Sequence, residues 1–315
     1  MPDNQQLAFV FPGQGSQSVG MSTGLAEHYP LVKELYAEAS DVLGYDLWRL
    51  VHSGPESELN ITSKTQPALL TASVAAWQVW EKRGGPLPAL MAGHSLGEYS
   101  ALVCSGVLAF NAAVALVADR GAYMQSAVPA GTGSMAAILG LTDAQVIDVC
   151  KQAAQGQIVS AANFNSAGQI VIAGHKEAVN RVVELATDAG AKRTIVLSVS
   201  VPSHCALMQA AAAKLTSRME SITLSAGRIP VIHNVDVSLR SEASAIKQAL
   251  AGQLYQPVRW VETIEFMSKK GITRIVECGP GKVLCGLIKR INRDIGTYPV
   301  FDPESLDKAL SVMNG

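Results

Sequence analysis

Short apolar runs and longer, almost uncharged segments alternate along the chain and predict strands followed by helices. Leu7 to Phe11 is an apolar run closed by Pro12-Gly13, which predicts a buried strand ending in a tight loop. The nearly uncharged run from Pro67 to Trp80 predicts a buried helix that begins at the proline, and Gly84-Gly85-Pro86 would stop it. Ala89 to Ala92 predicts another buried strand.

Two helices are expected next, one to about Ser105 and one from Asn111 to about Ala127, and the period then changes at Gly133. The segment that follows predicts a unit of its own. Its expected elements are a strand from Gly133 to Gly140, a helix from the capping box Thr142-Asp143-Ala144-Gln145 to about Ala154, strands from Gln157 to Asn163 and from Gly168 to Gly174 joined through Asn165-Ser166-Ala167, a helix from Glu177 to Asp188 and a strand from Lys192 to Val199. The order strand, helix, strand, strand, helix, strand is ferredoxin-like. We therefore predict a small α+β subdomain over residues 128–199.

Strand and helix patterns alternate again after this unit. Ile229 to His233 predicts a strand, a helix ends at Lys269-Lys270-Gly271, and Thr273 to Cys278 predicts a strand before Gly279-Pro280-Gly281. Such alternation is typical of a mostly parallel sheet covered on both faces. We predict an α/β fold with one large discontinuous domain, residues 1–127 and 200–315, that carries the small subdomain as an insert.

Length and composition agree with a compact globular protein of this size. The chain has 315 residues, of which 48% are hydrophobic and 16% charged, so one large domain and a smaller one can each bury a core. Lys and Arg total 25 against 26 for Asp and Glu, and no basic block is present. This balance argues against a nucleic-acid partner.

The cysteines and the N-terminal segment indicate a reducing compartment. The five cysteines are odd in number and contain no Cys-x-x-Cys pair, so neither a disulfide framework nor a zinc site is suggested. No basic segment precedes the first apolar run, and no apolar stretch approaches membrane-spanning length. We expect a cytoplasmic protein without membrane insertion and without a metal or other cofactor. The sequence leaves oligomeric state open, and a monomer is the simplest expectation.

Gly93-His94-Ser95-Leu96-Gly97 fits a nucleophile elbow, in which a serine stands on a tight turn between a strand and a helix. A strand is predicted before it and a helix after it. The Ser95 hydroxyl would then lie at a helix N-terminus, where backbone NH groups favour developing negative charge. A plain strand-to-helix turn that happens to contain serine is the alternative interpretation.

A serine nucleophile needs a base, and the chain has six histidines. His204 lies in Val201-Pro202-Ser203-His204-Cys205, a short rigid loop between a predicted strand and a helix, where a positioned catalytic group is expected. His94 adjoins Ser95, but consecutive residues at an elbow diverge, so a packed or hydrogen-bonded neighbour is expected there. Position alone leaves a structural role for His204 equally open. The remaining histidines have surface, helix-start or strand-end placements: His28, His52, His175 and His233.

Arg120 interrupts the apolar face of the second helix after the elbow, in Ala118-Asp119-Arg120-Gly121. Asp119 cannot pair with it across one helix face. A solvated arginine is the ordinary alternative, whereas a buried arginine would call for a carboxylate held bidentately.

Other motif matches are incomplete. Gly13-Gln14-Gly15-Ser16-Gln17-Ser18 has serine where a dinucleotide fingerprint needs its third glycine, and Gly281-Lys282 lacks the rest of a phosphate loop. Neither a His-Glu-x-x-His run nor a Cys/His cluster indicates a metal. Nicotinamide, nucleoside triphosphate and metal functions are therefore set aside.

Seven ordered motifs between about Leu7 and Gly286 resemble the malonyl-CoA:acyl carrier protein transacylase family of bacterial fatty acid synthesis. They are Phe11-Pro12-Gly13-Gln14-Gly15-Ser16-Gln17, Gln66-Pro67-Ala68, Gly93-His94-Ser95-Leu96-Gly97-Glu98, Arg120-Gly121, Asn163-Phe164-Asn165-Ser166, Ser203-His204 and Gln253-Leu254-Tyr255-Gln256-Pro257-Val258. The resemblance implies a hydrolase-like large domain with a mostly parallel sheet and a small ferredoxin-like α+β subdomain.

The resemblance also implies a ping-pong transfer of malonyl from malonyl-CoA to acyl carrier protein. Ser95 would carry the malonyl ester, His204 would act as general base, and the backbone carbonyl of Gln253 would orient His204 in place of a triad acid. Further roles follow for backbone NH groups in an oxyanion hole and for side chains that bind substrate. These residues are Gln14 and Leu96 for the oxyanion, and Arg120, Gln66 and Asn165 for the substrate.

Two rival functions stay open from the sequence alone. A serine hydrolase would need an acid between Ser95 and His204, for which Asp119, Asp143 and Asp148 are candidates in helical contexts. A protein that binds coenzyme A or carrier protein without chemistry is the other rival. The pathway, fatty acid or polyketide, is open too. Basic residues near the C-terminus are either a docking surface for carrier protein or a solvated helix face: Lys282, Lys289 and Arg290.

Overall fold

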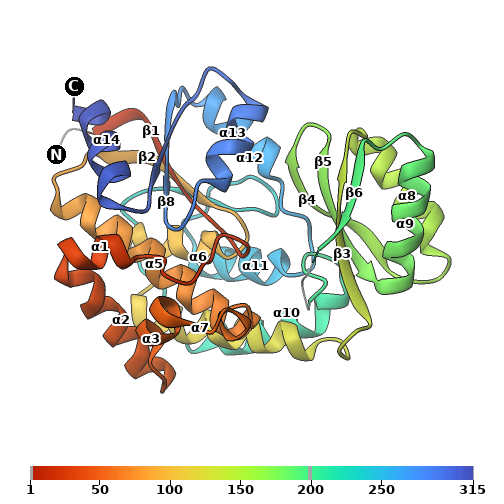
Figure 1. Cartoon of the computed structure of the whole chain (residues 1–315), viewed down its shortest axis with the longest axis horizontal. Helices are drawn as coiled ribbons and strands as arrows, with labels where there is room; N and C mark the ends of the chain where they lie inside the picture. The colour runs from red at the N-terminus through yellow and green to blue at the C-terminus, as the bar shows by residue number, and fades with distance from the viewer. Residues whose placement is uncertain (1–2, 198–200, 315) are drawn as a thin grey trace.

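The computed structural model describes residues 3–197 and 201–314 and contains two separate sheets (Figure 1). The larger sheet has the strand order β7-β2-β1-β8-β9, and every neighbouring pair in it is parallel. Its strands are β1 (Asp3–Phe11), β2 (Leu87–Gly93), β7 (Val231–Ile232), β8 (Arg274–Cys278) and β9 (Gly296–Val300). The predicted α/β class with a mostly parallel sheet is confirmed.

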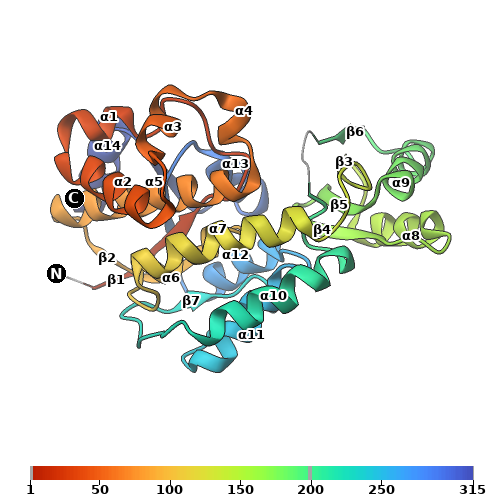
Figure 2. The same cartoon turned by 90° about the horizontal axis from the view of Figure 1, so that it is seen from below.

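Side chains of the central strand β1 alternate between two cores, so the sheet is covered on both faces. Leu7, Phe9 and Phe11 pack into one core with α2, α5, α6 and α7, whereas Ala8 and Val10 pack into the other with α12 and α13. Figure 2 shows the helices of the first layer from below. The helices of this domain are α1 (Thr23–His28), α2 (Pro30–Leu43), α3 (Leu47–Ser53), α4 (Glu56–Leu59), α5 (Thr62–Lys82), α6 (Gly97–Cys104), α7 (Phe110–Ser126), α10 (Gln209–Glu220), α11 (Ala243–Gln253), α12 (Trp260–Lys269), α13 (Val283–Ile291) and α14 (Pro303–Asn314), with a 3-10 turn at Ala206–Met208.

The helix expected to begin at Pro67 begins five residues earlier, at Thr62. Its first turn is closed by hydrogen bonds from Lys64 N and Thr65 N to the Ile61 carbonyl, and the Thr65 hydroxyl donates to the Leu59 carbonyl. Pro67 therefore lies inside the helix, near its start. The predicted start is wrong because hydrogen bonds of the residues before Pro67, and not the proline itself, form the first turn.

The smaller sheet is antiparallel, with strand order β4-β5-β3-β6. Its elements are β3 (Gly133–Leu139), α8 (Asp143–Ala154), β4 (Val159–Ser166), β5 (Gln169–His175), α9 (Lys176–Asp188) and β6 (Arg193–Val196). The ferredoxin-like order is confirmed, and the predicted capping box of Thr142 and Gln145 begins α8. The expected domain boundary at residues 199–200 lies outside the described residues. The division of the chain into 1–127 with 200–315 and 128–199 stays a prediction.

The strand β4 runs further than expected, because Asn165 and Ser166 belong to it and only Ala167-Gly168 forms the turn. Asn and Ser favour turns locally, but here the ladder with β5 continues to the Ser166–Gln169 pair. The large domain pairs with the same strand: Phe164 N donates to the Val258 carbonyl, and Val258 N donates to the Ala162 carbonyl. Asn163 and Asn165 are thereby fixed where the two sheets meet.

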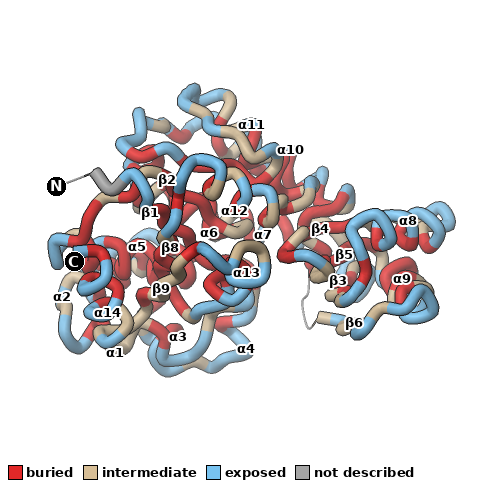
Figure 3. The backbone as a smooth tube through the Cα atoms, turned by 90° about the horizontal axis from the view of Figure 1, so that it is seen from above, coloured by how far each residue is buried: buried red, intermediate tan, exposed pale blue. Residues whose placement is uncertain are grey.

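Buried positions follow the strands and the inner helix faces, while the outer sides of α8 and α9 are exposed (Figure 3). In the part of the chain that the structure describes, no helix combines the length and the apolar character needed to cross a membrane.

Candidate active site

Ser95 stands on the tight turn that connects β2 to α6, in a left-handed conformation with φ 51°. The turn requires glycine on either side because of close contacts. A Cβ on Gly93 would lie 1.8 Å from the Gly97 carbonyl carbon, and a Cβ on Gly97 would lie 2.0 Å from the Phe11 carbonyl oxygen. The strained serine conformation is the feature that aims its hydroxyl into the adjoining cavity.

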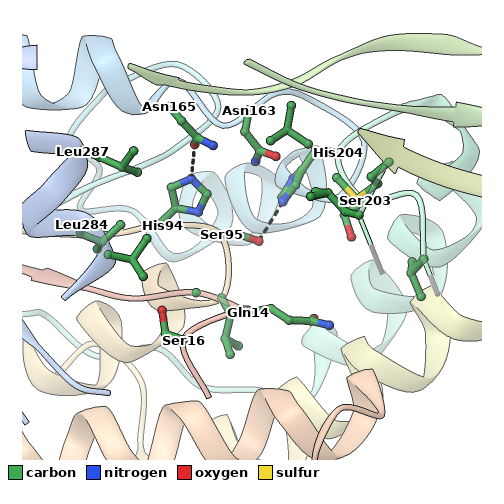
Figure 4. A pocket seen from close by; sticks show the side chains of 18 of the residues that line it. Gln14, Ser16, His94, Ser95, Asn163, Asn165, Ser203, His204, Leu284 and Leu287 are labelled. Carbon is green, nitrogen blue, oxygen red and sulfur yellow. Dashed lines mark hydrogen bonds between the residues drawn. The ribbon is translucent and has the colours of Figure 1, made fainter. Parts of the chain in front are cut away.

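His204 lies 2.8 Å from Ser95 through Nε2 and Oγ (Figure 4). Its other ring nitrogen, Nδ1, donates to the backbone carbonyl of Gln253 at 2.7 Å, which fixes the tautomer with Nε2 free to accept. The His204 backbone NH donates to the Leu254 carbonyl at 2.9 Å. Because α11 ends at Gln253, its C-terminal carbonyl groups hold this histidine.

No described carboxylate bonds to His204. Asp119 pairs with Arg218 at 2.7 Å and Asp148 with Lys151 at 3.0 Å, both away from the histidine. Asp143 is exposed at the start of α8. The three acids considered for a triad therefore do not meet the Ser95–His204 pair.

Burial lowers the pKa of His204 to about 3, and the nearby Arg120 charge adds to that lowering. The bond to the Gln253 carbonyl opposes it. His204 is thus neutral near pH 7, which is the form that can accept a proton from Ser95.

Arg120 lies on α7 with 1% of its surface exposed, and its guanidinium points toward Ser95. Its Nη1 donates to Gln66 Oε1 at 2.8 Å, and its Nη2 donates to Gln253 Oε1 at 2.9 Å and to Ser95 Oγ at 3.4 Å. The guanidinium also lies over the Tyr99 ring, 5.3 Å from its centroid. Every described partner is neutral, so the arginine holds a positive charge beside the nucleophile without a bonded carboxylate.

The close approach of α5 and α7 explains why Gln66 reaches this arginine. A Cβ on Gly121 would lie 2.6 Å from the Ser63 Cα, so only glycine permits the two helices to pack at this distance. Gln66 and Arg120 are both about 1% exposed. The Arg120-Gly121 pair thus combines a charge with the contact that buries it.

A cavity of about 260 Å³ opens above Ser95 between the two sheets. Its walls come from the loop Gly13–Ser16, from α13 through Leu284 and Leu287, and from the small subdomain through Asn163 and Asn165 (Figure 4). The backbone NH groups of Gln14 and Leu96 donate to no other described residue, and both residues line the cavity.

Asn165 meets the elbow through His94, whose Nε2 lies 2.8 Å from Asn165 Oδ1. The His94 ring packs edge-on against Trp260, with centroids 5.4 Å apart. Burial lowers the pKa of His94, so the residue is a neutral neighbour that links the small subdomain to the nucleophile turn.

The sequence did not predict the buried polar residues that lie beneath the elbow. Asn234 accepts from Ser95 N at 2.8 Å and donates to the Gly93 carbonyl at 2.7 Å, so it ties down the turn from below. Glu98 and His233 are each 0% exposed, and His233 Nδ1 lies 2.7 Å from Glu98 Oε1. Glu98 stood in a quoted motif and His233 at the end of a strand, but no spacing rule connects residues so far apart in the chain.

Comparison with known proteins places the chain in a family. Residues 8–296 match the model of the acyl transferase domain. The malonyl CoA-acyl carrier protein transacylase of Salmonella typhimurium is 58% identical over 306 residues, which cover 97% of this chain and 99% of the relative. The chain belongs to the malonyl CoA-acyl carrier protein transacylase family.

Solved structures of this transacylase family superpose closely on the chain. A malonyl-transacylase in complex with its type II PKS acyl-carrier protein is 56% identical, with a TM-score of 0.97 and coverage of 98% of this chain and 99% of that one. An acyl carrier protein S-malonyltransferase from Vibrio cholerae is 56% identical, with a TM-score of 0.95 and coverage of 96% and 99%. The two-sheet arrangement is therefore the transacylase fold.

Proposed function

We propose that this chain transfers the malonyl group of malonyl-CoA to the phosphopantetheine thiol of acyl carrier protein, in fatty acid biosynthesis. The observation that carries the proposal is that a histidine and an arginine both lie within hydrogen-bonding distance of one serine hydroxyl. Ser95 Oγ lies 2.8 Å from the neutral His204 and 3.4 Å from Arg120, whose charge has no bonded carboxylate among the described residues. A base and a carboxylate clamp at one serine suit an acyl donor with a free acid group.

In the first half-reaction His204 takes the proton of Ser95 as its oxygen attacks the malonyl thioester carbonyl. The NH groups of Gln14 and Leu96 stabilise the oxyanion that forms. The intermediate collapses to the Ser95 ester, the carbon–sulfur bond breaks, and His204 returns the proton to the departing coenzyme A thiolate.

In the second half-reaction the phosphopantetheine thiol of carrier protein gives its proton to His204 and attacks the Ser95 ester. The ester carbon–oxygen bond then breaks, and His204 protonates Ser95. The Gln253 carbonyl holds His204 in one tautomer throughout, so an acidic third member is not required.

Arg120 binds the malonyl carboxylate and thereby selects a diacid. Gln66 orients the guanidinium from one side and the Gln253 side chain from the other. An acetyl group offers only a methyl there and would leave the buried charge unpaired, which is costly. Asn165 contributes to the substrate wall through its position in the cavity and its bond to His94.

A carrier protein of a polyketide pathway is the second candidate acceptor. The observation that favours it is the 56% identical malonyl-transacylase whose structure holds a type II PKS acyl-carrier protein. Lys289 and Arg290 are exposed on α13, which flanks the cavity, and Lys282 is exposed just before it. Arg290 bonds Gln169 of the small subdomain. Transfer rates to the two kinds of carrier protein, compared side by side, distinguish these acceptors.

A cytoplasmic location fits the five unpaired cysteines, all of which are buried thiols.

Trapping the intermediate tests the proposal. Mixing the protein with malonyl-CoA should give a malonyl adduct that mass spectrometry locates on Ser95, and carrier protein should discharge it much faster than water does. The Ser95→Ala variant is the matched control and should give no adduct. An unmodified Ser95, or an adduct released as free malonate as fast as carrier protein accepts it, would overturn the transferase assignment.

A further inference from the structure

Three hydrogen bonds converge on the carboxylate of Glu98, which lies in the first turn of α6 and is 0% exposed. Its Oε1 accepts from His233 Nδ1 at 2.7 Å. Its Oε2 accepts from Asn234 N at 3.0 Å and from Gln253 Nε2 at 2.8 Å. Glu98 does not line the cavity. A buried carboxylate is stable only when donors surround it, and here they do.

The bond to Gln253 determines which way its side-chain amide faces. A carboxylate only accepts and a guanidinium only donates, so Gln253 Nε2 faces Glu98 and its Oε1 faces Arg120 Nη2 at 2.9 Å. Nε2 also donates to the Ser95 carbonyl at 2.9 Å. A flipped amide would place its NH2 group against the Arg120 donor and its oxygen against the acceptors of Glu98 and Ser95. Glu98 and the Ser95 carbonyl on one side and Arg120 on the other therefore hold the amide in one orientation.

Charge gives a second reason for this arrangement. Burial lowers the pKa of Arg120, while Tyr99 and then Glu98 oppose that lowering. If Glu98 bonded the guanidinium directly, it would occupy the clamp that an incoming carboxylate needs. Separated from Arg120 by one amide, it supports the cation and leaves the clamp open.

We propose that Glu98 is a positioning residue for the malonyl clamp, acting through the Gln253 side chain to hold Arg120 ready for a carboxylate. The proposal rests on the proposed function, because it assigns the residue that sets its acyl selectivity. It makes selectivity between malonyl and acetyl depend on a side chain that touches neither acyl group.

The test compares Glu98→Gln with the wild type on malonyl-CoA and acetyl-CoA. A neutral amide at position 98 removes the carboxylate that accepts from Gln253 Nε2 and supports the Arg120 cation, so kcat/KM for malonyl-CoA should fall about 10- to 100-fold, mostly through KM. The acetyl-CoA rate should fall far less. In an Arg120→Ala background the same change should not alter the malonyl-to-acetyl ratio further, because the coupling partner is gone.

Glu277 supplies a matched control. It is also 0% exposed, but it accepts from Leu284 N at 3.0 Å and Cys285 N at 2.7 Å, at the start of α13, and bonds nothing near Arg120. Glu277→Gln should lower the unfolding midpoint while the malonyl-to-acetyl ratio stays at the wild-type value. If Glu98→Gln does not fold, Gln253→Met removes the amide and keeps the backbone carbonyl; it should show the same selective loss.

Equal losses for both thioesters in Glu98→Gln or Gln253→Met, or an equal change of ratio in Glu277→Gln, would overturn the positioning role. A wild-type protein that transfers no malonyl group would instead overturn the proposed function, so the two failures are distinguishable.

Discussion

The cores beneath the two sheets differ in what they bury. Under the large sheet lie ionisable side chains that are nearly inaccessible, including Glu98, Arg120 and His204. The core of the small subdomain is built from aliphatic residues such as Ile138, Ile170 and Ile172, and no charged side chain is buried between described residues 133 and 196. Its buried polar side chains include Asn163 and Asn165, which face the cavity.

This difference teaches that the two domains stabilise the site in different ways. Each buried charge under the elbow is held by several partners, which fixes geometry at a cost in desolvation. The small subdomain gains its stability from apolar packing of α8 and α9 on its sheet and supplies one wall of the cavity. Substitutions in the first region should change chemistry, and substitutions in the second should change stability.

Ser95→Ala should have the largest effect, because it removes the atom that carries the acyl group. We expect transfer of malonyl to carrier protein to fall by at least about 10³-fold with the fold intact. Circular dichroism checks the fold and a thiol-release assay checks the rate. Activity near the wild-type level would mean that a different group carries the acyl chain.

Arg120→Ala comes next and tests the charged region directly. Removing one partner of a buried charge pair costs about 2–5 kcal/mol, so kcat/KM for malonyl-CoA should fall about 30-fold or more. Acetyl-CoA should lose much less, since it offers no carboxylate. Steady-state assays with both thioesters give the ratio, and equal losses would argue against a clamp.

The pH dependence of the transfer rate tests whether the Arg120 charge lowers the pKa of His204. The pKa of His204 is lowered to about 3, first by burial and then by Arg120. His204 is a base only above its pKa, so its acid limb in the wild type lies below about pH 4. Without the Arg120 charge this pKa rises, and the limb should move to higher pH.

Acetyl-CoA is the substrate for that profile, because it does not depend on the clamp. Arg120→Lys keeps a positive charge and should keep the limb near its wild-type position. An unchanged limb in Arg120→Ala would show that burial alone sets the pKa of His204.

Thr142→Ala tests the small subdomain and should have the smallest effect. Thr142 accepts from Gln145 N as the N-cap of α8, and losing such a cap costs about 1 kcal/mol. Urea unfolding should show this loss, whereas kcat/KM for malonyl-CoA should not change. A clear loss of activity in a fully folded variant would show that the small subdomain affects the chemistry as well as the stability.

Local sequence patterns were enough to predict the features that depend only on neighbouring residues. The elbow, the capping box of α8 and the succession of strands and helices in the small subdomain all follow from residues close together in the chain. Two element boundaries were predicted wrongly. Asn165 and Ser166 favour a turn, but the ladder with β5 continues to the Ser166–Gln169 pair and keeps both residues in β4. The turn bonds preceding α5 placed its start before Pro67.

By itself the sequence determined the fold class, the elbow that presents Ser95 and the family motifs in which His204, Arg120 and Gln253 stand. Only the tertiary structure decided how these residues meet: that His204 bonds Ser95, that Arg120 has neutral partners, and that the Gln253 amide donates to Glu98. The physical reason is the distance along the chain over which each effect acts. Periodicity and turn chemistry act over a few residues, whereas the Glu98–Gln253 bond joins groups 155 residues apart, and such a contact depends on how the whole sheet and its helices pack.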